Sequence, residues 1–104
     1  MKKIPKIYLW YQPCFDKYAQ EYFEIPDPTS GFYIQRFYKK TDFLYRKNDI
    51  VCFAGGNVNF VVAKCFHDPK RNQWEIEVHL SDTSHGNHDA YKKHLEENWT
   101  TQAP

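Results

Sequence analysis

Cysteine, net charge and long apolar runs are all scarce in this 104-residue sequence, and each shortage excludes a class of protein. The three cysteines are an odd number with no close pair, which disfavours a disulfide framework and fits reduced thiols in the cytoplasm. A formal net charge of +1 disfavours a dedicated DNA-binding domain, because contacts to phosphates usually need a strongly basic face. No apolar run approaches the length that crosses a membrane, so no membrane partner is expected.

The N-terminal segment, MKKIPKIYLWYQP, resembles a basic leader only at its start. Pro5 and Lys6 interrupt the apolar run, and Gln12-Pro13 closes it before a signal-peptide core with a cleavage site can form. We therefore expect a cytoplasmic protein.

Aromatic residues, by contrast, are plentiful: they make up 18% of the chain, with eight Tyr, eight Phe and three Trp against a single Met. Rings give a large contact area at a low cost in conformational entropy. A core or a binding surface built mainly from rings is therefore expected. The length suits one globular domain over residues 1–104, with a frayed tail at about residues 100–104.

The clearest structural pattern lies in residues 45–80, which read as three strands in series at residues 50–54, 57–67 and 73–80. Glycine, asparagine and proline occupy the two interruptions, and these residues favour turns. In the last strand an apolar and a polar set alternate strictly: Trp74, Ile76, Val78 and Leu80, and Gln73, Glu75, Glu77 and His79. This alternation predicts one buried and one solvent-exposed face.

The flanking segments predict two helices and two more strands. Residues 7–11 (IYLWY) favour a strand, and residues 14–23 favour a short helix with one apolar face. Residues 32–38 favour a strand with rings on both faces, which is typical of a strand that is sandwiched or lends one side to a partner. A turn at residues 39–42 follows, and residues 90–99 favour a helix packed on the sheet. The predicted fold class is α+β, a bent antiparallel sheet with a short N-terminal helix and a C-terminal helix.

The central stretch also resembles a known family. Tyr45-x-x-Asn48-Asp49-x-Val51, then Ala63-Lys64-Cys65, a turn and Trp74-x-x-x-Val78 are similar to the strand order of small SH3-like barrels of the Tudor and chromo-barrel kind. The resemblance is confined to residues 45–80. It implies a partly open SH3-like barrel, and a binding module for peptides, often modified ones, or nucleic acid rather than a catalyst.

The same resemblance implies a cage or stacking platform at one rim of the barrel, made by Tyr45, Phe53, Phe60 and Trp74. Phe53 and Phe60 are expected to be exposed, since each alternates away from its small and aliphatic neighbours. Trp74 opens the apolar face of its strand, so core packing is the simpler interpretation of that ring.

We predict that the chain recognises another protein, as an inhibitor, an immunity-type protein or an adaptor, through exposed rings bordered by lysine and arginine. The predicted binding residues are Tyr33, Phe37, Tyr45, Phe53, Phe60, Lys39, Lys40 and Arg46. The alternative is a single-stranded nucleic-acid binder in which three of these rings, Tyr33, Phe37 and Phe53, stack on bases beside Lys39, Lys40, Arg46 and Lys47.

A metal-dependent function is a further alternative. The possible ligands are His79, His85, His88 and His94, with Asp82 and Asp89 nearby, and imidazole and carboxylate groups are donors that zinc accepts. Their spacing does not make them converge, because they fall on a strand, a glycine-containing loop and a helix. We therefore predict no metal and no cofactor.

A cysteine- or histidine-dependent enzyme is the last alternative. Cys65 and His67 supply a thiol and a base, but Cys65 is expected in the core beside Val61 and Ala63. A solvated sheet face accounts for the carboxylates of the last strand, and a tight turn accounts for Gly55-Gly56. We predict no catalytic residues.

Overall fold

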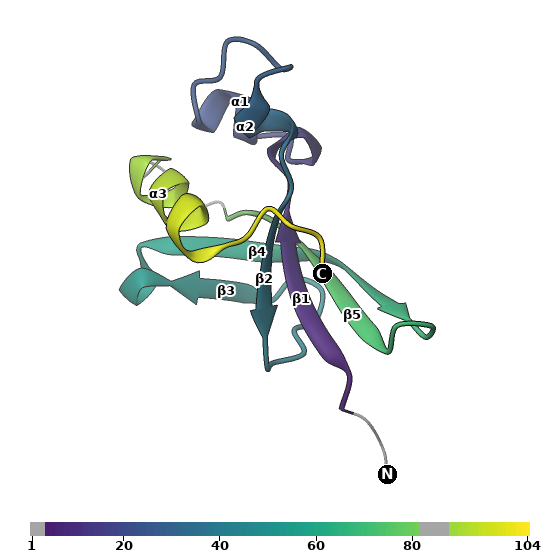
Figure 1. Ribbon diagram of the computed structural model, residues 1–104. Coiled ribbons are helices and arrows are strands. Elements are labelled where there is room, and N and C mark those ends of the chain that lie inside the picture. Colours follow the sequence, from purple (N-terminus) through teal and green to yellow (C-terminus); the bar gives the residue numbers. More distant parts are fainter. Residues whose placement is uncertain (1–3, 82–87) are drawn as a thin grey trace.

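The computed structural model describes residues 4–81 and 88–104, and their fold is α+β, as predicted (Figure 1). Five strands form one curled sheet that resembles half of a barrel, with a C-terminal helix beside it. The elements in chain order, where η marks a 3₁₀ helix, are β1 (Lys6–Tyr11), η1 (Pro13–Phe15), α1 (Ala19–Tyr22), α2 (Gly31–Ile34), β2 (Phe37–Thr41), β3 (Ile50–Phe53), η2 (Ala54–Gly56), β4 (Val58–Asp68), β5 (Gln73–Leu80) and α3 (His88–Asn98).

The strand order across the sheet is β2-β1-β5-β4-β3. β1 and β5 run parallel, while all other neighbours are antiparallel, so the sheet is mixed rather than fully antiparallel. The sequence of β1 explains its interior position. Leu9 and Tyr11 lie on one face, Tyr8 and Trp10 lie on the other, and all four are buried or half-buried. Interior strands of a sheet that are covered on both faces typically read as continuous apolar runs, as β1 does.

The core lies between one face of the sheet and α3 (Figure 1). Its buried residues include Leu9, Tyr11, Phe37, Val51, Val58, Phe60, Val62, Ile76, Val78 and Leu80 from the strands, and Tyr91, Leu95 and Trp99 from α3 and the residue after it. The Tyr91 hydroxyl accepts a hydrogen bond from the Asn59 N–H (2.6 Å) and donates one to the Asn59 carbonyl (2.9 Å). The predicted C-terminal helix and its apolar face are therefore confirmed.

The predicted helix over residues 14–23 is broken in two at Asp16. The backbone there is extended (φ −101°, ψ 114°), and the side chain, only 2% exposed, turns into the core. Its carboxylate accepts hydrogen bonds from the Tyr11 hydroxyl (3.2 Å), the Leu80 N–H (2.7 Å) and the Tyr18 N–H (3.1 Å). Burial and this carboxylate raise the pKa of Tyr11 well above its ordinary value, so its phenol stays a donor. These bonds fasten the segment after β1 to the end of β5.

The predicted strand over residues 32–38 is wrong. The Ser30 Oγ accepts a hydrogen bond from the Tyr33 N–H (3.4 Å) and caps α2, so the first residues of that segment are helical. The strand β2 begins only at Phe37. It continues through Thr41 in register with β1, so the turn predicted at residues 39–42 is wrong as well.

The faces of β3 and of the first half of β4 are the reverse of those predicted. The residues that face the core are Val51, Phe53, Val58, Phe60 and Val62, while Ile50 and Cys52 are exposed. A β-bulge between Val62 and Lys64 then shifts the alternation by one residue. Cys65 therefore packs against the core, as predicted, but Val61 lies on the opposite face.

The polar face of β5 is less exposed to solvent than the alternation predicts. Gln73 and Glu77 on that face are buried, because β5 lies at the centre of the sheet and side chains of β1 and β4 flank it. Glu77 also pairs with His79, with 2.7 Å between Oε2 and Nε2. On the other face, Trp74 is half-buried and packs on His67, with 4.8 Å between ring centroids.

Candidate functional site

The eight predicted binding residues do not form one surface. Phe37 and Phe60 are buried, with 2% and 0% of their surface exposed, so the prediction that Phe60 is an exposed ring and that Phe37 meets a partner is wrong. Phe37 lies opposite Tyr11 on the core face of β2, and Phe60 lies on the core face of β4. Of the others, Lys40 and Arg46 are exposed, Tyr33 and Tyr45 are half-buried against the core, and Lys39 and Phe53 are half-buried near each other.

The four rings that the barrel resemblance places in a cage lie in separate clusters. Tyr45 packs on Phe43, with 4.7 Å between ring centroids, and Trp74 packs on a histidine of β4. Phe53 and Phe60, 6.2 Å apart, belong to the cluster beneath α3. Within residues 4–81 and 88–104, no ring contact joins the first two rings to this pair.

Lys39, Phe53 and α3 form a half-buried corner. The Lys39 Nζ lies 5.8 Å from the Phe53 ring centroid and donates a hydrogen bond to the Asn98 carbonyl (3.3 Å). The His94 ring stacks on Phe53 at 4.8 Å with an interplanar angle of 32°. Burial, and then the charge of Lys39, lower the pKa of His94. The side-chain amide nitrogen of Asn98 lies 3.2 Å from His94 Nδ1.

We expect His94 to titrate below the ordinary value of 6.5. The folded protein then binds this proton less tightly than the unfolded chain does, so His94 costs stability as the pH falls below 6.5. Lys39→Met should raise the pKa of His94 only part of the way back to its ordinary value, because the burial of the ring remains. NMR titration of the histidine Hε1 resonances measures this, with Lys40→Met on the same strand as the matched control. An unchanged titration midpoint of His94 in Lys39→Met would contradict the contribution of the Lys39 charge to the lowered pKa.

The histidines considered as metal ligands lie apart. His79 is on the face of β5 opposite the core, paired with Glu77, whereas His94 is part of α3 and packs on Phe53. His88 opens α3 with its ring 6.3 Å from that of Tyr22, and His85 lies outside the described residues. Across the described ranges, no three His, Cys, Asp or Glu side chains gather as a metal site would require.

Cys65 is held in its neutral form. Burial, with a contribution from the Asp49 carboxylate, raises the pKa of its thiol, and the thiol donates a hydrogen bond to the Tyr45 carbonyl, with 3.4 Å between Sγ and the oxygen. His67, the base considered for it, packs on Trp74. Because the thiolate is the nucleophile, this environment disfavours cysteine chemistry.

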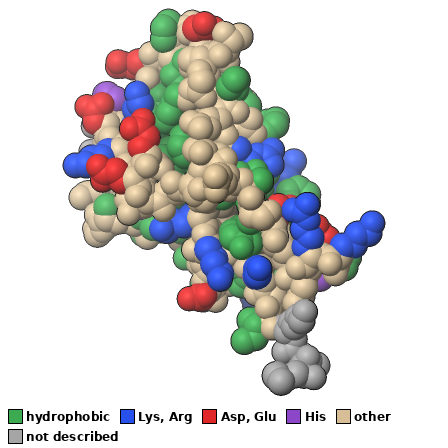
Figure 2. Space-filling model, in the orientation of Figure 1, with side chains coloured by type: hydrophobic (Ala, Val, Ile, Leu, Met, Phe, Trp, Pro, Cys, Tyr) green, Lys and Arg blue, Asp and Glu red, His purple; other side chains and the backbone are tan. Residues whose placement is uncertain are grey.

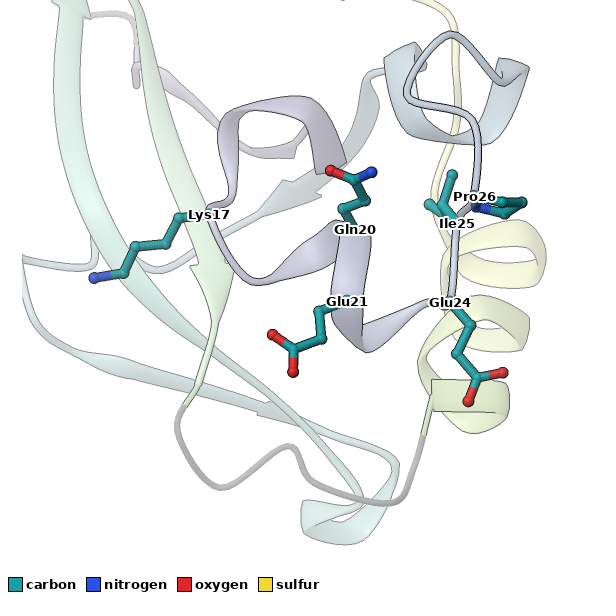
Figure 3. Close-up of a pocket in the computed structure, with 6 residues that line it drawn as sticks. All are labelled: Lys17, Gln20, Glu21, Glu24, Ile25 and Pro26. Atoms are coloured by element: carbon teal, nitrogen blue, oxygen red, sulfur yellow. The ribbon is translucent and has the colours of Figure 1, made fainter.

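A shallow depression of about 550 Å³ lies beside α1 (Figure 3). Its lining residues are Lys17, Gln20, Glu21, Glu24, Ile25 and Pro26. The carboxylates of Glu21 and Glu24 lie apart from each other, and the Lys17 side chain turns away from both (Figure 3). The depression therefore has no convergent set of polar groups.

The sheet face opposite the core carries rings and charges together. The register places Tyr8 beside Lys40 and Trp10 beside Tyr38 on this face. Glu75 and Glu77 follow on β5, next to Tyr8 and Trp10. Lys64 and Phe66 of β4 lie beyond them, and Phe66 is 49% exposed. α3 and the core residues lie on the other face, and on this one Trp10 and Glu77 are buried by their neighbours while Lys40, Lys64 and Phe66 are exposed.

One end of this face is organised around Arg36, and we call Trp10, Gln12, Phe15, Ile34 and Arg36 the Arg36 platform. The Arg36 guanidinium carbon lies over the Trp10 ring, 4.1 Å from its centroid, and Nε donates to Gln12 Oε1 (3.2 Å). Gln12 Nε2 donates in turn to the Ile34 carbonyl (2.7 Å). The Phe15 ring meets Trp10 edge-on at 6.2 Å. Phe15 and Ile34 remain 55% and 54% exposed.

Local sequence explains how the platform is assembled. Trp10 projects from the interior strand β1, and Gln12 follows the end of that strand. Pro13 is the first residue of η1, where its fixed φ suits a helical turn and its missing N–H costs nothing, and η1 carries Phe15. Arg36 lies between the end of α2 and the start of β2, and the sequence alone does not show that Trp10 lies beneath it.

None of the helices in residues 4–81 and 88–104 is long and apolar enough to span a membrane. Comparison of the chain with protein-family models, with curated proteins and with solved structures finds no match.

Proposed function

We propose that this chain is a non-enzymatic binding protein that recognises another protein through the Arg36 platform. The observation that carries the proposal is that Arg36 is fixed over Trp10 while Phe15 and Ile34 beside it stay more than half exposed. Exposed apolar side chains around a fixed cation are a binding surface rather than a core. An inhibitor, an immunity-type protein or an adaptor would use such a surface.

The composition of the platform supports a protein partner. Trp, Tyr and Arg are the residues most enriched among those that dominate binding energy at protein interfaces, and Tyr38 adjoins Trp10 by register. The hydrogen bond from Arg36 to Gln12 and the contact with Trp10 hold the long side chain in one place before binding. An ordered side chain loses less entropy when a partner docks.

The fold agrees with a recognition function. The curled half-barrel sheet is compatible with a barrel-like fold, and the Tudor and chromo-barrel domains that residues 45–80 resemble are binding modules. We propose recognition of the same general kind. The surface differs from a barrel rim, however, because it is built from residues 10–36 and not from the stretch that carries the resemblance.

A single-stranded nucleic-acid binder is the second candidate. The observation that favours it is the set of rings and lysines on the sheet face opposite the core, Tyr8, Tyr38, Phe66, Lys40 and Lys64, since bases stack on rings and phosphates attract lysine. Glu75 and Glu77 lie in the middle of that face and repel a polyanion. The protein-binding proposal is therefore preferred.

The test is a pull-down from native lysate with the wild type, a Phe15→Ala, Ile34→Ala double variant and a matched Phe43→Ala, Leu44→Ala control. The control removes two exposed apolar side chains from the β2–β3 connection instead. We expect one protein, insensitive to nuclease, to be recovered about tenfold less by the platform variant and equally by the control.

Other results would decide against the proposal. Recovery that disappears after nuclease treatment would favour the nucleic-acid candidate. Equal recovery by the wild type and a folded platform variant, judged by circular dichroism, would show that the platform is not the binding surface.

A further inference from the structure

We propose that the Arg36 platform binds a carboxylate: the partner presents an Asp or Glu side chain to Arg36, with apolar neighbours that contact Phe15 and Ile34. This inference rests on the proposed function and adds the chemistry of the partner. It is carried by the hydrogen bond that holds Arg36 on Gln12 and by the terminal nitrogens of Arg36, which are in none of the ion pairs among the described residues.

Arg36 uses one of the five N–H donors of its guanidinium. Its Nε is engaged by Gln12, and its guanidinium lies over Trp10. The ion pairs among the described residues join Arg71 to Asp68, His79 to Glu77 and His88 to Asp89, and none of them involves Arg36. The two terminal nitrogens carry four N–H groups, and this planar fork matches a carboxylate. The side chain is half-buried, but its terminal nitrogens are not among the buried, unpartnered nitrogens of the described residues, so a partner can reach the fork.

The surroundings strengthen such a pair. Phe15 contacts the Trp10 ring on which the guanidinium lies, and Ile34 is joined to Arg36 through Gln12. Both side chains are more than half exposed and would exclude water from this region once a partner covers them. Charge-assisted hydrogen bonds are stronger when water is excluded from them. An acidic residue set among apolar ones therefore fits better than an acidic residue in a strongly charged segment.

The charge pattern favours a single carboxylate over a polyphosphate. Glu77 lies beside Trp10 in the register of β1 and β5, and Glu75 lies beside Tyr8, so two acidic side chains follow the platform along the same face. A nucleic-acid strand bound along this face would bring its phosphates close to these two carboxylates, which repel them. One carboxylate needs only the fork of Arg36. Lys and Arg also outnumber Asp and Glu in residues 36–81, and Figure 2 shows blue side chains spread over that lower part of the molecule, which favours approach of an acidic partner.

The experiment is selection from a random peptide display library against the folded wild-type chain, Arg36→Gln and a matched Arg71→Gln control. Arg71 lies in the exposed β4–β5 turn, so this control removes the same charge from elsewhere. We expect the wild type and Arg71→Gln to enrich peptides with Asp or Glu at one fixed position between apolar residues, and Arg36→Gln to lose that position. In a synthetic peptide from the selection, replacing that acid by its amide should weaken binding about tenfold or more.

A second variant guards against misfolding. Arg36→Lys keeps the charge and the stem but not the planar fork, so it should stay folded and still weaken the peptide about tenfold. The wild type could instead enrich peptides that have no acidic residue and that do not bind the Phe15→Ala, Ile34→Ala variant. This result would overturn the proposal that Arg36 binds a carboxylate, but it would leave the proposed protein recognition standing. Equal enrichment of the acidic position on Arg36→Gln, or no enrichment on the wild type, would also overturn the carboxylate-binding proposal. Binding of an oligothymidylate probe at the platform, in place of peptides, would overturn both proposals.

Discussion

Replacing Phe60 by alanine should lower the free energy of unfolding by about 4 kcal/mol. The ring is fully buried and is surrounded by Tyr11, Tyr91 and Trp99, with 5.3, 5.5 and 5.6 Å between ring centroids. Truncation removes the apolar contacts of an entire ring and leaves a cavity between rigid neighbours that cannot collapse into it. Urea denaturation followed by circular dichroism measures the change.

Phe66 provides the matched control, since it lies on the same strand but is 49% exposed on the opposite face. Phe66→Ala should change the free energy of unfolding by only about 0.5 kcal/mol. Two variants of similar, small effect would contradict the core position of Phe60 and would restore the sequence-based prediction of an exposed ring.

Replacing Asp16 by alanine should lower the free energy of unfolding by about 3 kcal/mol. The substitution removes the acceptor for the Tyr11 hydroxyl and for the N–H groups of Leu80 and Tyr18. Two of these donors lie in the core and would lose their partner without access to water, which costs about 1–3 kcal/mol for each group. Thermal and urea unfolding of the same samples measure the loss.

Asp27 is the control for this substitution. Its carboxylate also accepts hydrogen bonds, from the N–H and hydroxyl of Thr29, but it is exposed, and water can replace it. Asp27→Ala should therefore cost less than about 1 kcal/mol. A double-mutant cycle with Tyr11→Phe isolates the Tyr11 bond, and an Asp16→Ala variant as stable as Asp27→Ala would show that the buried carboxylate does not fasten the segment.

The elements with regular periodicity could be predicted from the sequence. The strand β5 and the helix α3 lie where their alternation and helical spacing place them, and β1 lies where its run of β-favouring residues places it. In β5 and α3 the pattern repeats over several residues, so one unusual residue does not change the period. The helix predicted over residues 14–23 is too short for this, and the single buried carboxylate of Asp16 interrupts it.

The faces of β3 and β4 could not be predicted, and the physical reason is local. Both faces of β4 carry apolar residues before Val62, so the alternation has two acceptable phases, and the bulge after Val62 uses one phase and then the other. The prediction for Cys65 was correct and the one for Phe60 wrong for this reason. The Arg36 platform was missed for a different reason, because Trp10 and Arg36 meet only when β1 and β2 have paired.

The parallel pairing of β1 with β5 has a consequence for how the chain folds as it is synthesised. β3, β4 and β5 follow one another through short turns and can pair as they emerge, but Lys6 must wait for Gln73 before β1 gains its second neighbour. Contacts between such distant residues slow folding. Until then, the apolar segment IYLWY has an unpaired edge, so a nascent chain stalled before β5 should be a substrate for chaperones.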